Sequence, residues 1–567
     1  MLNTLILAAA LSLNGSWEFR FEEGKSFREV ANADFKATDA IVVPGCYDML
    51  PKWLCKRGSG LYRRTFRLEQ AVGNAWLVVD GMGLTGKFEI DGRDLGVHPY
   101  PYARLEIPTG PLAAGEHTLF AVLDNRFDRD YQKLANPNYD FYQCGGFYHG
   151  VSLEFDNRKL RVRTRDYKTG EVEIEVVNFR ERDFAATLVF DGKNAVKVKF
   201  SNARAQVKVP SFKLWSPESP NLHTVSLLAP SSSSPSALDY APHARFGIRT
   251  IEAKNRRLYL NGKELYLKGA NRHEAHPTFG AATPETVMMA DIQNLKALGG
   301  NYFRGAHYQQ VRRFLDLCDE NGILVWEESL GWGNQTRDLG DEGFVRDQLH
   351  QTTEMVRTSF NHPSVIFYGF MNEFAQQSKE GRALAEKLVK AIKAEDSGRL
   401  VTFACNHVLD EICCDLVDVV SVNLYPGWID LTEAGEPAHL HDLIFNGKFG
   451  VMTTARRFRE KYPDKPLTVS EMGTCGVYGR HDPAAAQWTE EFQAEYVGDV
   501  LDAVFAEPEF CGIAIWQFTD ARSYHRDGAT LRVKPFAENL AGLYDGYRRA
   551  KAVVPVVREK FLGKDAK

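Results

Sequence analysis

Residues 361–373 read NHPSVIFYGFMNE, and they contain the pattern from which the rest of the chain is interpreted. Turn residues at the start are followed by an uninterrupted apolar run, residues 365–371, which is typical of a strand buried on both faces. The run ends on Asn372 and Glu373. A strand that presents an amide and a carboxylate at its carboxyl end is suited to hold a catalytic acid. The same pair could also simply begin the following helix.

Around this stretch, the region from residue 250 onward repeats one pattern, in which apolar strands alternate with amphipathic helical segments. Parallel strands covered on both faces give apolar rather than alternating runs. Eight strand–helix repeats in roughly 310 residues predict a (β/α)8 barrel, or TIM barrel. We predict its strands at residues 265–271, 301–305, 323–328, 365–371, 400–405, 419–424, 467–470 and 512–518.

The first 249 residues follow a different pattern, in which short alternating strands are separated by turns. Residues 11–155 predict an all-β sandwich or jelly roll. Residues 156–249 contain strictly alternating runs such as EVEIEV at 171–176, which predict a smaller immunoglobulin-like β-sandwich. We therefore expect a multidomain protein in which two β domains precede a barrel over residues 250–567.

Composition and charge narrow the class of protein. An apolar content of 44% and a charged content of 25% are ordinary for a soluble globular protein of 567 residues. The net charge of −5 argues against a nucleic-acid or anionic membrane partner, and no apolar run is long enough to span a bilayer. Nine cysteines without regular spacing predict free thiols and a cytoplasmic location. The apolar run at residues 5–11, read as a shortened signal peptide, leaves an exported or periplasmic location as the alternative.

Two carboxylates follow strands of the predicted barrel. Glu373 ends the fourth strand and Glu471 ends the seventh, and the active sites of such barrels lie at the carboxyl ends of the strands. Strands three positions apart in a ring of eight can face each other across its mouth. Such a pair suits glycoside hydrolysis, in which one carboxyl group protonates the leaving oxygen and the other attacks the anomeric carbon. We predict Glu373 as the acid/base and Glu471 as the nucleophile.

Short motifs spread over nearly the whole chain carry a family resemblance. They are LNGSWEF at 13–19, DFY at 140–142 with GF at 146–147, LWSPESPNL at 214–222, FGIR at 246–249, GANRHE at 269–274 and RGAHY at 304–308. Together they resemble glycoside hydrolase family 2, the β-galactosidase and β-glucuronidase family. The resemblance implies a jelly-roll sugar-binding domain, an immunoglobulin-like sandwich and a catalytic barrel. It also implies a retaining double displacement, for which the two carboxyl groups are about 5–5.5 Å apart.

The resemblance further implies roles for residues around the two carboxylates. Asn372 would contact the sugar 2-hydroxyl, and Asp140 would reach another sugar hydroxyl from the first domain. His307, Tyr425 and Trp516 would line the subsite of the terminal sugar.

One departure from the family pattern concerns the sugar. Family 2 β-glucuronidases bind the sugar carboxylate with an Asn-x-Lys motif after the last strand, and the matching positions here are Asn539 and Ala541. Burying a carboxylate without a cation is costly, so the sequence favours a neutral β-galactoside. A β-glucuronide or β-galacturonide remains the alternative, because Arg532 or another basic residue of the preceding loop could replace the lysine. The other basic residues of that loop are Arg522, His525, Arg526 and Lys534.

The segment after the third strand bears on metal binding. Residues 327–333, EESLGWG, lack the ligands that hold Mg²⁺ in the large β-galactosidases of the family, so we expect no metal or other cofactor. The sequence thus predicts a retaining exo-β-glycosidase that acts on an oligosaccharide or glycoside, with a homo-oligomer left open as its state of assembly. A non-catalytic carbohydrate-binding protein on the same scaffold is the alternative from another class.

Overall fold

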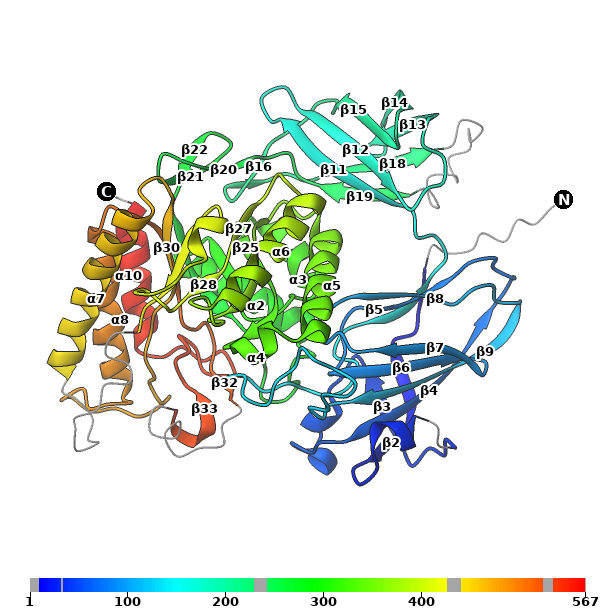
Figure 1. Ribbon diagram of the computed structural model, residues 1–567, viewed down its shortest axis with the longest axis horizontal. Coiled ribbons are helices and arrows are strands. Elements are labelled where there is room, and N and C mark those ends of the chain that lie inside the picture. The colour runs from blue at the N-terminus through cyan, green and yellow to red at the C-terminus, as the bar shows by residue number, and fades with distance from the viewer. Residues whose placement is uncertain (1–9, 32–33, 229–241, 426–439, 524–533, 566–567) are drawn as a thin grey trace. The chain divides into compact units, whose positions relative to one another are not determined.

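The structure is a computed structural model (Figure 1), and it describes residues 10–31, 34–228, 242–425, 440–523 and 534–565. The chain forms two compact units. The first contains residues 1–132, 143–249 and 357–363, and the second contains residues 133–142, 250–356 and 364–567. Segment 133–142 therefore belongs to the second unit, although it interrupts the first unit in sequence.

The first unit begins with two antiparallel sheets that share one apolar core. In spatial order the larger sheet contains β3 (Asp39–Val43), β2 (Gly15–Glu22), β4 (Ser59–Leu68), β9 (Gly115–Asp124), β6 (Thr85–Ile90) and β7 (Arg93–His98). The smaller sheet contains β1 (Ala10–Ser12), β10 (Val151–Glu154), β5 (Trp76–Val79) and β8 (Leu105–Pro108). Aromatic rings fill the core, where Trp17 lies 5.4 Å from Phe147 and Phe19 lies 4.9 Å from Tyr62. A short α-helix, α1 (Phe27–Val30), and two 3-10 helices, η1 (Tyr47–Met49) and η2 (Pro51–Trp53), accompany these strands.

A second pair of sheets in this unit has a separate core. One sheet contains β11 (Lys159–Asp166), β12 (Glu171–Val177) and β15 (Arg204–Lys208), and the other contains β14 (Asn194–Phe200), β13 (Phe184–Phe190), β18 (His223–Leu228) and β19 (His243–Phe246). Along β12, Val172, Ile174 and Val176 are buried while the glutamates between them are partly exposed. The strict alternation in the sequence therefore reflects one buried face, as an immunoglobulin-like sandwich requires. A small ribbon of β16 (Trp215–Ser216) and β17 (Ser219–Pro220) follows.

The second unit is built on a barrel of parallel strands. Their order around the ring is β23 (Leu267–Arg272), β24 (Tyr302–Gly305), β25 (Leu324–Trp332), β26 (Val365–Asn372), β27 (Leu400–Thr402) with β28 (Ala404–Cys405), β29 (Val420–Asn423), β30 (Leu467–Glu471) and β31 (Phe510–Ile515). β31 pairs with β23, so the ring returns to its first strand, and Phe403 interrupts the fifth strand. The predicted multidomain fold with a TIM barrel is thus confirmed.

Two barrel strands end away from their predicted positions: the third continues to Trp332 instead of residue 328, and the last is shorter than predicted. The last strand ends at Ile515 and not at residue 518, because the backbone after it leaves the sheet. The Trp516 N–H donates to the carbonyl of Met472 at 2.8 Å, and the Gln517 N–H donates to the carbonyl of Ala541 at 3.0 Å. Residues 516 and 517 therefore connect the barrel rim to the segment around residue 541.

Helices alternate with the barrel strands. They are α2 (Glu285–Ala297), α3 (Arg312–Asn321), α4 (Thr336–Leu339), α5 (Glu342–Ser359), α6 (Lys379–Glu395), α7 (Leu440–Lys461), α8 (Glu490–Ala506) and α10 (Val553–Asp565). Helix α8 packs between α7 and α10 (Figure 1). Hydroxyl caps fix two helix starts, since Ser378 accepts from the Gly381 N–H and Thr489 from the Phe492 N–H. None of the helices that the structure describes is long and apolar enough to cross a membrane.

Two small antiparallel elements complete this unit. A meander of β20 (Ile251–Lys254), β21 (Arg257–Leu260) and β22 (Lys263–Leu265) precedes the barrel. A ribbon after the last barrel strand joins β32 (Ala521–Arg522) to β33 (Glu538–Asn539), with Ala521 opposite Asn539. The ribbon holds residues after the eighth strand close to the barrel rim.

Candidate active site

Glu373 and Glu471 both stand at the carboxyl ends of barrel strands. Every residue of β26 is buried, and Glu373 is the first residue after it, whereas Glu471 is the last residue of β30. The backbone turns sharply at the end of β26, with φ of 41° at Met371 and 51° at Glu373. Left-handed backbone at residues other than glycine costs about 1–3 kcal/mol and clusters at functional sites. The Glu373 N–H is held by the carbonyl of Ala404 at 3.1 Å.

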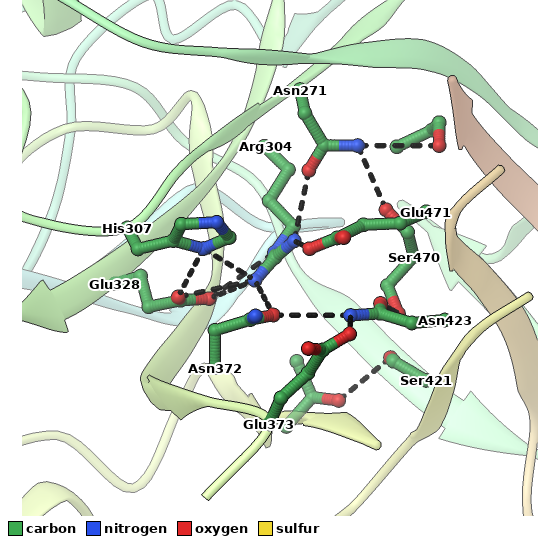
Figure 2. A network of polar contacts seen from close by, with 12 residues as sticks. Asn271, Arg304, His307, Glu328, Asn372, Glu373, Ser421, Asn423, Ser470 and Glu471 are labelled. Atoms are coloured by element: carbon green, nitrogen blue, oxygen red, sulfur yellow. Dashed lines mark hydrogen bonds and ion pairs between the residues drawn. The ribbon is translucent and has the colours of Figure 1, made fainter. Parts of the chain in front are cut away.

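Arg304, near the end of β24, is the centre of the polar network that surrounds the two carboxylates (Figure 2). Its guanidinium is buried and pairs with both Glu471 and Glu328, with Glu328 at 2.9 Å. It also donates to the side-chain oxygens of Asn271 and Asn372, each at 2.9 Å. Because one planar cation binds four acceptors from different strands, it fixes their mutual positions.

Glu471 is held by charge-assisted hydrogen bonds. One carboxylate oxygen accepts from Arg304, and the other accepts from the Tyr425 hydroxyl at 2.7 Å. Burial raises the pKa of Glu471, while Arg304 and Tyr425 act in the opposite direction because both stabilise the ionised form. Glu471 therefore has a direct cationic partner for its negative charge.

Glu373 has a contrasting environment. Its Oε1 accepts from the neutral amide of Asn423 at 2.6 Å. Burial and the nearby charge of Glu471 raise the pKa of Glu373 to about 7, against a weaker effect of the Asn423 hydrogen bond. A pair of carboxyl groups whose environments differ in this way divides into a proton-holding acid and an ionised base or nucleophile. These environments favour the proton of the pair on Glu373, because Glu471 has a cation and a hydroxyl donor that stabilise its ionised form.

An aromatic wall stands next to Arg304. The His307 ring stacks on Trp516 with centroids 5.2 Å apart, and His307 Nδ1 lies 3.2 Å from an Arg304 nitrogen. Burial and the Arg304 charge hold the pKa of His307 well below its usual range, so the ring is neutral. Nδ1 also lies 3.3 Å from Glu328 Oε1, so it faces both a donor and an acceptor, and these contacts fit either ring tautomer. Among the described residues, His307 Nε2 and the amide nitrogen of Asn372 are buried without a hydrogen-bond partner, which is the state expected of groups that bind a polar ligand.

Asp140 and Asn539 lie together in a neighbouring cluster of the same unit. One oxygen of Asp140 pairs with Lys534, and Asn539 Nδ2 lies 3.5 Å from that oxygen. The other oxygen accepts from the Ser523 hydroxyl. Arg532, which the sequence also proposed for substrate binding, lies outside the described residues.

The sequence placed three further network residues at strand ends without giving them a role. Arg304 pairs with Glu471, and Glu328 pairs with Arg304 from β25. Asn423 at the end of β29 donates to Asn372 at 3.2 Å and to Glu373. The sequence signal for these residues is a polar side chain in an otherwise apolar strand. Because a buried polar group needs a partner, such a residue is expected to take part in a polar network.

A group of potential metal ligands lies in the first unit, away from the barrel residues in sequence. Ligand atoms of Cys46, Asp48 and Cys144 lie within 4.8 Å of one another, and all three residues are buried. One Asp48 oxygen already accepts from the Asn125 amide at 2.8 Å and from the Gly145 N–H at 2.9 Å. The Asp48 carboxylate therefore connects two loops of the β fold through hydrogen bonds, which is a structural role that needs no metal.

A TIM barrel with two carboxyl groups of contrasting environment after its fourth and seventh strands is the arrangement expected of a glycoside hydrolase. The comparisons identify the family within that class. The model described as "Glycosyl hydrolases family 2, TIM barrel domain" matches residues 251–551, and "Glycosyl hydrolases family 2" matches residues 151–249. The chain belongs to glycoside hydrolase family 2.

Individual relatives show where the similarity lies. A β-glucuronidase of Streptococcus agalactiae serotype V is 27% identical over 464 residues, which cover 77% of this chain and 73% of that protein. The β-glucuronidase of Sus scrofa is 28% identical over 76% of this chain, but the match spans only 65% of that protein. The crystal structure of a β-galacturonidase from Eisenbergiella tayi bound to galacturonate is 28% identical, covers 99% of both chains and has a TM-score of 0.83.

These names bear on the sugar expected from the sequence. The relatives reported above are β-glucuronidases and a β-galacturonidase, so the comparisons favour the uronide alternative over the neutral β-galactoside. The preference for a galactoside rested on the missing lysine at position 541 alone. A cation supplied from elsewhere in the chain removes that objection.

Proposed function

We propose that the protein is a retaining exo-β-uronidase that removes a terminal β-linked uronic acid, with galacturonide preferred to glucuronide. The opposed environments of Glu373 and Glu471 carry the chemical part of this proposal. The similarity to the galacturonate-bound enzyme over 99% of both chains, together with Ala541 in place of the lysine expected in a β-glucuronidase, supports the choice of sugar. A β-glucuronide is the second candidate, which the glucuronidase relatives favour.

In the first step Glu471 attacks the anomeric carbon while Glu373 gives its proton to the glycosidic oxygen. The bond from the anomeric carbon to that oxygen breaks, a bond to a Glu471 carboxylate oxygen forms, and the aglycone leaves protonated. In the second step Glu373, now ionised, takes a proton from water, and the water oxygen displaces Glu471. Two inversions leave the anomeric configuration of the released sugar unchanged.

The surrounding residues have supporting roles in this proposal. Arg304 and Tyr425 keep Glu471 ionised and aimed, since both donate to its carboxylate. The amide nitrogen of Asn372 donates to the sugar 2-hydroxyl, a contact that strengthens in the transition state. His307 and Trp516 form the wall against which the sugar ring lies, and Asp140 accepts from a ring hydroxyl.

A panel of p-nitrophenyl β-glycosides tests the proposal. We expect the highest kcat/KM for the β-galacturonide, a lower value for the β-glucuronide and the lowest for the β-galactoside. Proton NMR of the first-formed sugar should show the β-anomer. The highest value for the β-galactoside, or release of the α-anomer, would overturn the proposal. Uronic acid binding without hydrolysis of any member would instead identify a non-catalytic carbohydrate-binding protein.

A further inference from the structure

The position of the lysine expected in a family β-glucuronidase is apolar in this chain. Ala541 is 1% exposed and packs with Trp516, Leu540 and Cys475 in a small apolar cluster. Residue 541 therefore supplies no cation to a bound ligand. A bound uronic acid would still bring a carboxylate, and a desolvated carboxylate needs a cation or several donors.

Lys534 supplies a buried cation a few residues earlier in the same segment. It is 9% exposed, and its ammonium group pairs with Asp140. The amide of Asn539 approaches the same Asp140 oxygen at 3.5 Å, and Ser523 donates to the other oxygen. The register of β32 with β33 places Ala521 opposite Asn539, so the ribbon holds both sides of this cluster. The side chains of Lys534 and Asn539 thus both approach the same oxygen of Asp140.

This cluster adjoins the rings that line the proposed sugar site. Phe141, the residue after Asp140, lies 5.2 Å from His273 and 6.1 Å from His307 between ring centroids. On the other side, the carbonyl of Asn539 accepts from the Gln517 side chain at 3.1 Å, and Gln517 follows Trp516 directly. Two segments therefore connect the cluster to the aromatic wall: Asp140 precedes Phe141, whose ring lies near His307, and Asn539 contacts Gln517, which follows Trp516.

Two other buried cations of the barrel unit, among the residues that the structure describes, have different tasks. Arg304 pairs with Glu471 and Glu328. Lys551 donates to Asp520 at 2.7 Å and to the carbonyls of Gly476 and Leu540. The three remaining buried cations among the described residues of this unit are also engaged elsewhere: Arg272 pairs with Asp291, Arg399 pairs with Asp396, and Lys268 donates to the carbonyl of Phe561. Lys534 is the buried cation that lies beside the predicted hydroxyl-binding Asp140.

We propose that Lys534, positioned by Asp140, binds the C6 carboxylate of the terminal uronic acid together with the amide of Asn539. The proposal rests on the uronidase function proposed above and names the specificity-determining residue of that site. An ammonium group carries three donors, so it can bind Asp140 and a ligand carboxylate at once. Burial lowers the pKa of Lys534 to about 7. A carboxylate in contact with an ammonium group, as Asp140 is here, acts in the opposite direction because it stabilises the charged form.

Replacing Lys534 by methionine tests this role through a ratio of activities. Lys534→Met should lower kcat/KM for p-nitrophenyl β-galacturonide by about 10- to 150-fold, the usual effect of losing a hydrogen bond to a charged group. The value for the β-galactoside should fall less than the value for the β-galacturonide, because a hydroxymethyl group needs no cation and this substrate is affected only through Asp140, which loses its partner. Lys534→Arg should recover part of the uronide activity. Lys534→Met should also raise the dissociation constant of free galacturonate, measured by calorimetry, in step with its loss of kcat/KM for the galacturonide.

Lys461→Met is the matched control. Lys461 pairs with the buried Glu411 at 2.5 Å, so this change also removes a lysine from a buried carboxylate, but it should leave the uronide-to-galactoside ratio unaltered. An unchanged ratio in folded Lys534→Met, or an equal loss on both substrates, would overturn the role of Lys534 and leave the uronidase function standing. If the wild-type protein hydrolyses no uronide, the proposed function itself fails. Thermal unfolding of each variant identifies losses that come from misfolding.

Discussion

Replacing Glu373 by glutamine removes the proposed proton donor with the least change in shape. The Asn423 amide, which donates to Glu373 Oε1 at 2.6 Å, can donate equally to the oxygen of a glutamine amide. The variant has no proton to give, however, and general acid catalysis contributes about 10²–10⁴-fold to rates. For an alkyl or saccharide aglycone, whose oxygen leaves only when protonated, kcat/KM should therefore fall by about 10²–10⁴-fold.

The loss should depend on the leaving group and on pH. A dinitrophenolate leaves as an anion, so its kcat/KM, which reports only the first displacement, should fall less than about tenfold. In the wild-type protein, Glu373 with a pKa of about 7 is protonated below neutral pH and loses its proton above it. The wild-type kcat/KM should consequently decline above pH 7, by about tenfold per pH unit. This alkaline limb should be missing in Glu373→Gln.

Stopped assays with an aryl and an alkyl uronide across the pH range measure both effects. Glu342→Gln, which alters an exposed carboxylate at the start of α5, is the matched control and should keep the wild-type profile. Equal losses on the two substrates, or an alkaline limb that persists in Glu373→Gln, would refute the assignment of the proton to Glu373.

Three further variants test Glu471 and two of its partners. Glu471→Gln should lower kcat by at least about 10⁴-fold, because the covalent step is lost, and near-wild-type turnover would be incompatible with its role as nucleophile. Tyr425→Phe removes a hydrogen bond that lowers the pKa of Glu471, so the acid limb of kcat/KM should move to higher pH; a limb that stays in place would contradict this. Arg304→Met leaves Glu328 and Glu471 buried without their cation and should destabilise the barrel unit by about 3–5 kcal/mol in urea unfolding. An unaltered midpoint would show that the network does not support the fold.

The sequence predicted the barrel well because burial on both faces leaves a clear record. A strand such as β26, buried at every position, must be apolar throughout, and the first polar residue marks its end. For this reason Asn372 and Glu373 could be placed at the barrel rim before the structure was known. The eighth strand was predicted to extend too far, because the large apolar residues Trp516 and Phe518 follow it after the backbone has left the sheet.

Side-chain partnerships were less predictable than strand positions. Nothing in the spacing of Arg304 relative to Glu471 and Glu328 specifies that one guanidinium binds both, since such a contact depends on strand register and rotamer. The pairing of Lys534 with Asp140 joins segments 394 residues apart in sequence, and it forms because segment 133–142 packs with the barrel unit. The sequence shows that the loop before Asn539 is basic, but it does not show which of the basic side chains is buried.

Covalent trapping with a 2-deoxy-2-fluoro-β-galacturonosyl fluoride tests the central claim most directly, because it requires the sugar class, the retaining mechanism and the nucleophile together. The fluorine slows both displacements and the fluoride leaves readily, so the glycosyl-enzyme intermediate accumulates. Mass spectrometry of the intact protein should show one added fluorouronosyl group, and peptide mapping should place it on Glu471. A label on any other residue, or labelling only by the corresponding neutral galactosyl fluoride, would contradict the account.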